Sequence, residues 1–149
     1  MRCFLPAAVA DLGEIAPAIF FSGAPACADT AALRRALPDA DDEERELVAS
    51  LAAADYSALA YESGPARRVV LAADAAVDPA ASPQLPCDVT LSEAITWDDV
   101  VAILIDEEAA EAAVRAAAGD ADALASLEDF DLLWYDVTER GDLAAALQS

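Results

Sequence analysis

Six consecutive apolar residues, Val100 to Ile105, constrain the fold of this chain more than any other feature. A strand with one face in water alternates apolar and polar residues, and this run does not alternate. We therefore expect a strand that is covered on both faces and lies in the middle of a sheet. Asp106 ends the run, and its carboxylate is a suitable N-cap for the alanine-rich helix that we expect to follow and to end at Gly119.

Shorter patterns predict the other elements. Further strands are expected at residues 2–5, 19–22, 67–76, 88–94 and 132–137. Short helices are expected at residues 7–16, 31–37, 121–130 and 142–147, and an irregular loop at residues 78–86. Residues 88–94 alternate as a strand with one wet face does. We expect this strand to lie between the 67–76 strand and the 100–105 strand, antiparallel to both.

The longest helix is expected at residues 41–63. Its apolar residues recur at steps of three and four, which makes one continuous face and predicts that this face packs on the sheet. The residues of this face are Leu47, Leu51, Ala54, Ala58 and Tyr61. Acidic residues fill the first turn, where the helix dipole favours them, and a glycine and a proline end the pattern.

Together these elements predict a single α+β domain. Its sheet is expected to be mixed but mainly antiparallel, with about five or six strands and helices packed over it. Ferredoxin-like topology is one candidate. The length of 149 residues suits one domain with a proper core, and no repeat or linker divides the sequence.

The charge of the chain limits its partners. Against 29 acidic residues stand only 8 basic ones, all arginine, which gives a net charge of −21. Such a field repels phosphate backbones and anionic lipid, so we expect neither nucleic acid nor a membrane surface as a partner. Two interpretations of the acidity stay open. The surface could bind a basic protein, or it could provide solubility in a high-salt or high-GC organism that uses arginine instead of lysine.

The location of the protein is predicted from segments that the sequence lacks. No signal-peptide core and no run of about 20 apolar residues occurs, which favours a soluble, cytoplasmic protein. The three cysteines, Cys3, Cys27 and Cys87, are widely spaced without a Cys-x-x-Cys pair. We interpret them as reduced, partly buried thiols.

Missing residue types exclude several chemistries. The chain contains no histidine, which excludes Ser-His-Asp and Cys-His catalysis and the usual histidine-containing zinc sites. It contains no lysine, which excludes Schiff-base catalysis and a P-loop lysine. The five glycines are dispersed, so no glycine-rich phosphate cradle is present. Carboxylate and thiol groups remain as the candidates for catalysis or metal binding.

Two carboxylates stand at the ends of buried strands, Asp74 and Asp106. If these strands are parallel neighbours, both carboxylates meet at one edge of the sheet and could bind Mg²⁺, with Asp99 as a further ligand. That arrangement would suit a divalent-metal-dependent hydrolase. If the strands are antiparallel, or separated by another strand, the carboxylates lie apart. Asp106 is then a helix cap, Asp74 the start of a loop, and Asp99 part of a turn beside Trp97.

Trp134 and Tyr135 form an aromatic pair near the end of the sequence. As consecutive strand residues they point to opposite faces of the sheet, so one is expected in the core and the other in a groove or an interface. A small-molecule pocket under the long helix, with Tyr61 or Trp134 in its wall, is a third functional hypothesis. The leading hypothesis is a non-enzymatic protein-binding domain that needs no cofactor and whose acidic surface binds a basic partner.

Several segments resemble an uncharacterised actinobacterial family with a domain of unknown function. They are the start Met-Arg-Cys-Phe-Leu-Pro, Arg-Arg-Val-Val-Leu-Ala-Ala-Asp at residues 67–74, Ile-Thr-Trp-Asp-Asp-Val-Val-Ala-Ile-Leu-Ile-Asp-Glu at residues 95–107, and Leu-Leu-Trp-Tyr at residues 132–135. Members of that family are small, acidic and alanine-rich, and typically open Met-Arg-Val-Tyr-Leu-Pro, so Cys3 and Phe4 depart from the pattern. The resemblance spans nearly the whole chain. It implies a cytosolic bacterial protein with one compact domain, and it transfers no catalytic residue.

Overall fold

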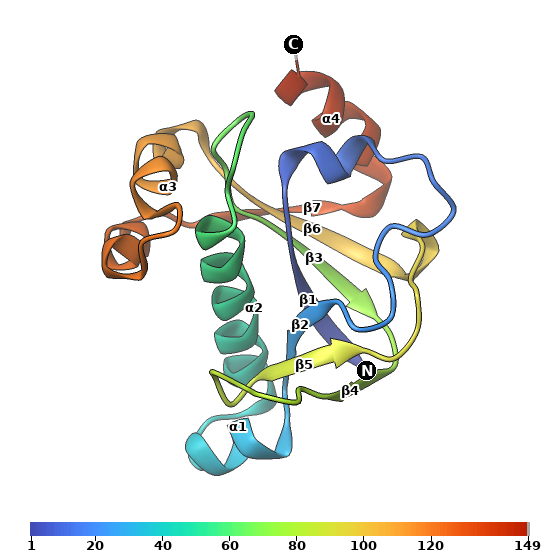
Figure 1. Cartoon of the computed structure of the whole chain (residues 1–149), viewed down its shortest axis with the longest axis vertical. Coiled ribbons are helices and arrows are strands. Elements are labelled where there is room, and N and C mark those ends of the chain that lie inside the picture. Colours follow the sequence, from blue (N-terminus) through green and yellow to red (C-terminus); the bar gives the residue numbers. More distant parts are fainter. Residues whose placement is uncertain (149) are drawn as a thin grey trace.

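Seven strands form one sheet in the computed structural model, which describes residues 1–148. The strands are β1 (Arg2–Ala7), β2 (Pro25–Ala28), β3 (Val69–Asp74), β4 (Val77–Pro79), β5 (Asp88–Leu91), β6 (Val100–Asp106) and β7 (Leu132–Asp136). Their order across the sheet is β4-β5-β2-β1-β3-β6-β7, and every neighbouring pair is antiparallel (Figure 1).

Four α-helices and several 3-10 helices lie between or after the strands within the described residues. The α-helices are α1 (Ala31–Ala36), α2 (Asp42–Leu59), α3 (Glu111–Ala117) and α4 (Arg140–Gln148). The 3-10 helices are η1 (Val9–Gly13), η2 (Trp97–Asp99), η3 (Glu108–Ala110), η4 (Ala121–Asp129) and η5 (Val137–Glu139). None of the helices in this part of the chain is both long and apolar enough to cross a lipid bilayer.

The predicted α+β class is confirmed, but the sheet differs in detail. It has more strands than expected and contains no parallel pair in the described chain. The two strands that the sequence did not predict, β2 and β4, are only 4 and 3 residues long and each has a proline at one end. Short, proline-bounded strands carry little strand signal. The strand predicted at residues 19–22 is reduced to one isolated bridge, between Phe20 and Ile95.

The strand neighbours also differ from the prediction. β5 pairs with β2 and β4, while β3 pairs directly with β6. The chain from β2 through α1 and α2 to β3 crosses over β1, as in one half of a ferredoxin-like fold. β6 and β7, however, are adjacent and antiparallel, so the second crossover of that fold is absent from the described chain. The topology is therefore not ferredoxin-like.

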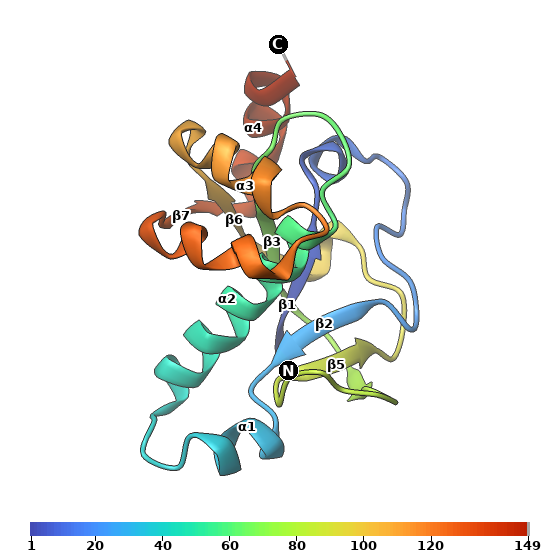
Figure 2. The ribbon, with the colours of Figure 1, turned by 60° about the vertical axis from the view of Figure 1, so that its left-hand side comes forward.

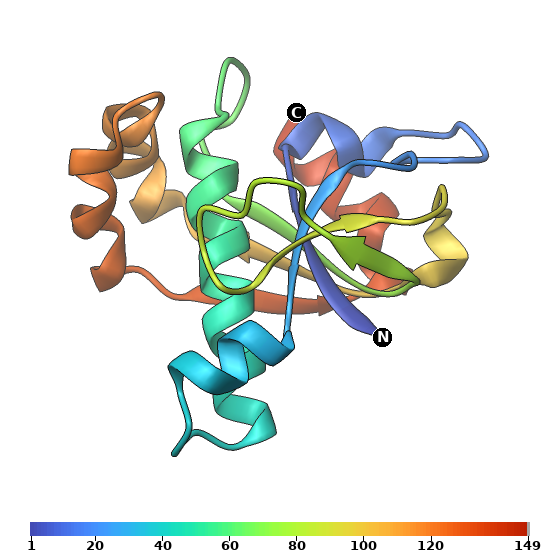
Figure 3. The ribbon, with the colours of Figure 1, turned by 60° about the horizontal axis from the view of Figure 1, so that its bottom comes forward.

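Apolar clusters cover both faces of the sheet, as expected for the β6 run. On one face, Phe4, Val70 and Leu104 pack against α2. On the other, Leu5, Leu71 and Ile103 pack with η1 and α4, which Figure 3 shows away from α2. A smaller cluster joins the end of α2 to α3 and η4 (Figure 2). This third cluster places η4 beside α2, close to the end of the sheet formed by β7.

Helix α2 forms where the sequence predicts it, but only part of the predicted apolar face is buried. Its N-cap is Asp41, whose carboxylate accepts a hydrogen bond from the Glu44 backbone N–H. Ala54 and Ala58 of this face are fully buried, as is the neighbouring Ala53, whereas its leucines, Leu47 and Leu51, are 58% and 46% exposed. Small alanine side chains let the helix backbone approach the sheet closely, and that spacing has no room for leucine. The leucines therefore point sideways, toward β7 and η4.

Candidate functional site

The carboxylates that were candidate magnesium ligands do not converge. Because β3 and β6 are antiparallel, with Val69 opposite Ile105, their carboxyl ends lie at opposite edges of the sheet. Asp74 at one edge forms an ion pair of 2.9 Å with Arg2, and this hydrogen-bonded partner lowers the pKa of Asp74. Asp106 ends β6 at the other edge. The parallel arrangement required for a shared Mg²⁺ site is therefore absent.

Asp99 does not complete a metal site either. It lies just before β6, at the Asp74 end of the sheet, and its carboxylate accepts a hydrogen bond of 2.9 Å from the Thr96 backbone N–H. This is the turn-and-cap role that the sequence offered as the alternative. Among the described residues, Asp74, Asp99 and Asp106 form no group of ligand atoms close enough to share one ion. The hydrolase hypothesis thus loses the geometry on which it was based.

Asp106 forms a buried ion pair instead of the predicted helix cap. Its carboxylate accepts hydrogen bonds from the Arg68 backbone N–H, Nε and Nη2 at 2.8, 2.9 and 2.8 Å. The side chains of Arg68 and Asp106 are 4% and 0% exposed, and Arg68 Nη2 also donates to the Phe130 carbonyl oxygen. The sequence prediction missed this partner because Arg68 comes close only after β3 pairs with β6. The pair ties β3, β6 and the segment before β7 together.

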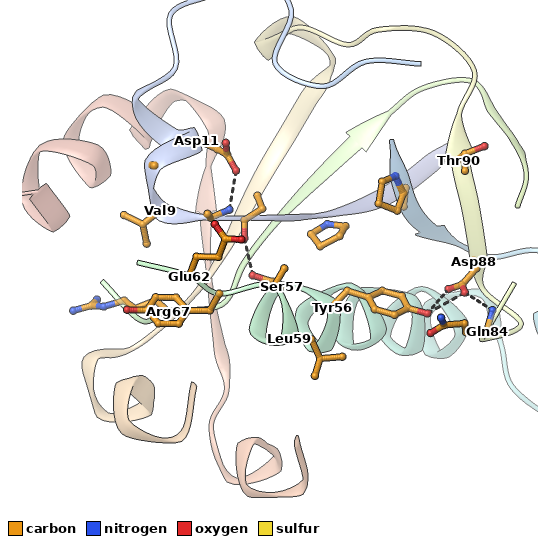
Figure 4. A pocket seen from close by; sticks show the side chains of 18 of the residues that line it. Val9, Asp11, Tyr56, Ser57, Leu59, Glu62, Arg67, Gln84, Asp88 and Thr90 are labelled. Atoms are coloured by element: carbon orange, nitrogen blue, oxygen red, sulfur yellow. Dashed lines mark hydrogen bonds between the residues drawn. The ribbon is translucent and has the colours of Figure 1, made fainter. Parts of the chain in front are cut away.

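A pocket of about 710 Å³ lies between the second half of α2 and the strands β1, β2 and β5 (Figure 4). Its wall includes Tyr61, as one functional hypothesis expected, and the Tyr61 hydroxyl donates to the Gly64 carbonyl oxygen at 2.6 Å. Ser57 also lines it, but its hydroxyl is occupied by the Ala7 carbonyl oxygen and the Val69 N–H. The volume suits a small molecule.

Asp88 stands at one end of this pocket, in a dense set of hydrogen bonds. The Tyr56 hydroxyl donates to the Asp88 carboxylate at 2.9 Å, and the backbone N–H groups of Gln84 and Leu85 donate at 2.8 and 3.0 Å. Figure 4 shows Tyr56 reaching from α2 to this carboxylate. Burial and the hydrogen bond to Asp88 raise the pKa of the Tyr56 phenol. The carboxylate is therefore fixed in position.

Two cysteines that are far apart in sequence meet behind Asp88. The Cys27 Sγ lies 3.9 Å from Asp88 Oδ1, and the Cys87 Sγ lies within 4.8 Å of Cys27 Sγ and of an Asp88 carboxylate oxygen. The interaction between the two thiols lowers the pKa of Cys87, while the same interaction and burial raise the pKa of Cys27. The sequence analysis kept the cysteines separate because their contact depends on the pairing of Cys27 with Asp88 between β2 and β5. β2 was one of the strands that it missed.

An apolar groove lies on the α2 side of β7. Its volume is about 720 Å³, and α2, η4, β6 and β7 line it with large apolar side chains. They are Leu47, Leu51, Leu104, Leu124, Leu127, Phe130, Leu132 and Trp134. Trp134 is 60% exposed. Tyr135 lies on the other face, packed against the core, so the consecutive aromatic residues divide between core and groove as the strand alternation indicates.

Acidic side chains surround the groove. Asp55, Glu128 and Asp131 line it, and its one basic residue, Arg68, is engaged by Asp106. Burial raises the pKa of Asp55; the Arg68 charge opposes this shift, and the Glu128 charge adds to it. The groove thus combines an apolar floor with a negative rim. Of its residues, Trp134 was the one that the sequence analysis named as a candidate for a groove or an interface.

The molecule is thus an α+β protein with one antiparallel sheet, a buried ion pair, a pocket and an acidic apolar groove. It belongs to the family of unknown function DUF6912, whose model matches residues 1–144. This match confirms the resemblance to a domain family of unknown function. Comparison with curated proteins found no match. Comparison with solved structures found none either.

Proposed function

We propose that the protein is a non-enzymatic, cytoplasmic protein-binding domain whose groove between α2, η4 and β7 binds a basic, apolar segment of a partner. The observation that carries the proposal is the exposure of Trp134, Leu47 and Leu51, at 60%, 58% and 46%, around one groove. Large apolar side chains that gather on a surface are typical of interaction sites, and tryptophan is enriched among the residues that dominate binding energy.

The groove has the anatomy of a protein interface. Its floor contains Leu104 and Leu127, which are almost fully buried, and its walls are formed by side chains that a partner could cover. β7 is the last strand of the sheet, paired in the described chain with β6 alone. An edge strand next to an apolar groove offers both backbone hydrogen bonds and side-chain contacts to a docking segment.

The charge around the groove selects the partner. Asp55, Glu128 and Asp131 are negative, and Arg68 is 3% exposed and bound to Asp106. A segment with arginine or lysine beside its apolar residues would be attracted by the rim, and by the whole chain with its charge of −21. Nucleic acid would be repelled by the same field. This supports a basic protein as the partner.

A peptide-display library of random sequences, selected against the immobilised protein, tests this proposal. We expect the enriched peptides to combine basic and large apolar residues and to lose affinity as salt is raised, because salt screens the acidic rim. Nuclear magnetic resonance would then locate the contact, and the strongest shifts are expected at Leu51, Leu132 and Trp134. Enrichment of acidic peptides, or shifts confined to other parts of the chain, would contradict the proposal.

A further inference from the structure

We infer that Cys27, Cys87 and Asp88 form a binding site for one zinc ion. One ligand atom from each of the three residues lies within 4.8 Å of the other two. This site shares no residue with the groove and goes beyond the proposed function. It is the one such group of cysteine and carboxylate side chains found in the described part of the chain.

The spacing of the ligand atoms suits tetrahedral coordination. Zinc binds thiolate sulfur at about 2.3 Å and carboxylate oxygen at about 2.0–2.2 Å, which places neighbouring ligand atoms about 3.5–4 Å apart. The separation of Cys27 Sγ from Asp88 Oδ1 is 3.9 Å. Two sulfur ligands favour zinc over magnesium or calcium, which prefer sites made entirely of oxygen.

The fold holds these side chains in place before any ion binds. Cys27 lies in β2 opposite Asp88 of β5, and the Ala28 N–H donates to the Cys87 carbonyl oxygen at 2.9 Å. Tyr56, together with the Gln84 and Leu85 N–H groups, orients the Asp88 carboxylate. Hydrogen bonds to a ligand of this kind tune and position metal sites. Cys27 and Cys87 are 0% and 2% exposed, so bulk water reaches neither sulfur freely.

Zinc binding has a defined proton balance. The ion binds thiolates, so Cys27 and Cys87 each release one proton to the solvent, and no electron is transferred. The Cys27 S–H then no longer donates to Asp88 Oδ1, and the Tyr56 hydroxyl, 2.9 Å from both carboxylate oxygens, can stay on Oδ2 while Oδ1 binds the metal. Asp88 and Tyr56 line the 710 Å³ pocket, so a water molecule from the pocket can occupy the fourth position.

A metal titration of the reduced 149-residue chain tests the site. After removal of metals by a chelator, Co²⁺ is added first, because tetrahedral thiolate-bound cobalt has intense visible and charge-transfer absorption. We expect one Co²⁺ per chain, displacement by one Zn²⁺, and two protons released per zinc in weakly buffered indicator solution. Cys27→Ser and Cys87→Ser are each expected to lower the affinity at least about 100-fold.

Cys3→Ser is the matched control, because Cys3 is equally buried but packs in β1 on the other face of the sheet. It should leave the cobalt spectrum and the affinity unchanged. Circular dichroism shows whether each variant folds. If a serine variant does not fold, the nearly isosteric Asp88→Asn takes its place, and we expect it to lower the metal affinity at least about tenfold. A cobalt spectrum without thiolate bands, or equal loss in Cys3→Ser, would overturn the inference.

Discussion

At the scale of single residues, Arg68 and Asp106 form an ion pair that is buried at the end of β6. Asp106→Ala removes three hydrogen bonds and leaves the Arg68 guanidinium buried without its counter-charge. Loss of one partner of a buried pair costs about 3–5 kcal/mol, and we expect a drop of this size in the free energy of unfolding in urea. The double variant Arg68→Met/Asp106→Leu should lose less. A loss below about 1 kcal/mol in Asp106→Ala would contradict the buried pairing.

Ser57 connects α2 to two strands through one hydroxyl. It donates to the Ala7 carbonyl oxygen at 2.6 Å and accepts from the Val69 N–H at 3.1 Å. Ser57→Ala leaves both backbone groups unsatisfied in a buried place, so we expect a loss of about 1–3 kcal/mol in urea denaturation. Ser126→Ala is the control, because the exposed Ser126 hydroxyl bonds only to Ala123 in the same helix. Equal losses in the two variants would contradict the role of Ser57.

Asp55 and Asp74 should affect stability in opposite directions. Burial raises the pKa of Asp55 above its usual 3.8, so the folded state favours the protonated carboxyl group. The stability that this preference contributes is fully present below pH 3.8 and is lost as pH rises through the folded-state pKa. Asp55→Asn should therefore stabilise the fold at neutral pH and have no such effect in acid. Arg2 lowers the pKa of Asp74, so Asp74→Asn should destabilise at neutral pH, and the difference should vanish as pH falls.

Urea denaturation at neutral pH and below pH 3.8 measures both effects, since 3.8 is the ordinary pKa of an aspartate. Both side chains are in contact with water, so each effect should stay below about 1 kcal/mol. The same sign of change in Asp55→Asn and Asp74→Asn at neutral pH would contradict this account. The two variants thus serve as controls for each other.

At the scale of elements, the sequence predicts the position of α2 but not the full extent of its buried face. The acidic first turn, the apolar recurrence and the following glycine locate the helix, because these signals are local. The buried face is not local information: it depends on how closely the helix approaches the sheet. Ala54 and Ala58 of the predicted face are buried, but the buried surface extends to Ala49 and Ala53 rather than to the predicted leucines.

This packing leads to an expectation for two substitutions on the same helix. Ala53 is fully buried, so Ala53→Leu should overpack the interface with the sheet and cost about 1–3 kcal/mol in the free energy of unfolding. Leu51 is 46% exposed, so Leu51→Ala should cost less than about 1 kcal/mol. If Leu51→Ala proves more destabilising than Ala53→Leu in urea denaturation, the predicted leucine face is the packed one after all.

Strand pairing shows the same limit of sequence information. β6 was predicted in mid-sheet with both faces covered, and it lies between β3 and β7 with apolar clusters on each side. Its long apolar run is a local signal. The neighbours of β5 could not be derived, because β2 and β4 have 4 and 3 residues and too little pattern to be recognised. Without them, the meeting of Cys27 with Asp88 could not be foreseen.

At the scale of the whole molecule, charge and shape act together at the groove. The net charge of −21 is a property of the composition, and the sequence alone left open whether it serves binding or solubility. The structure adds a place where acidic residues surround exposed apolar ones. Trp134 was a candidate from the sequence because consecutive strand residues such as Trp134 and Tyr135 point to opposite faces of a sheet. Its neighbours in the groove, Leu47 and Leu51, come from α2, 83 or more positions earlier in the sequence.

The affinity of Trp134→Ala for a selected basic peptide tests the central proposal most directly. Trp134 lines the groove, and removal of a central tryptophan should weaken binding at least about tenfold, as measured by calorimetry. Leu133→Ala is the matched control, because Leu133 is 41% exposed on the same strand but points to the opposite face. Its affinity should stay within about twofold of that of the unmodified protein. Equal affinity of both variants, or a greater loss in Leu133→Ala, would contradict docking in the groove.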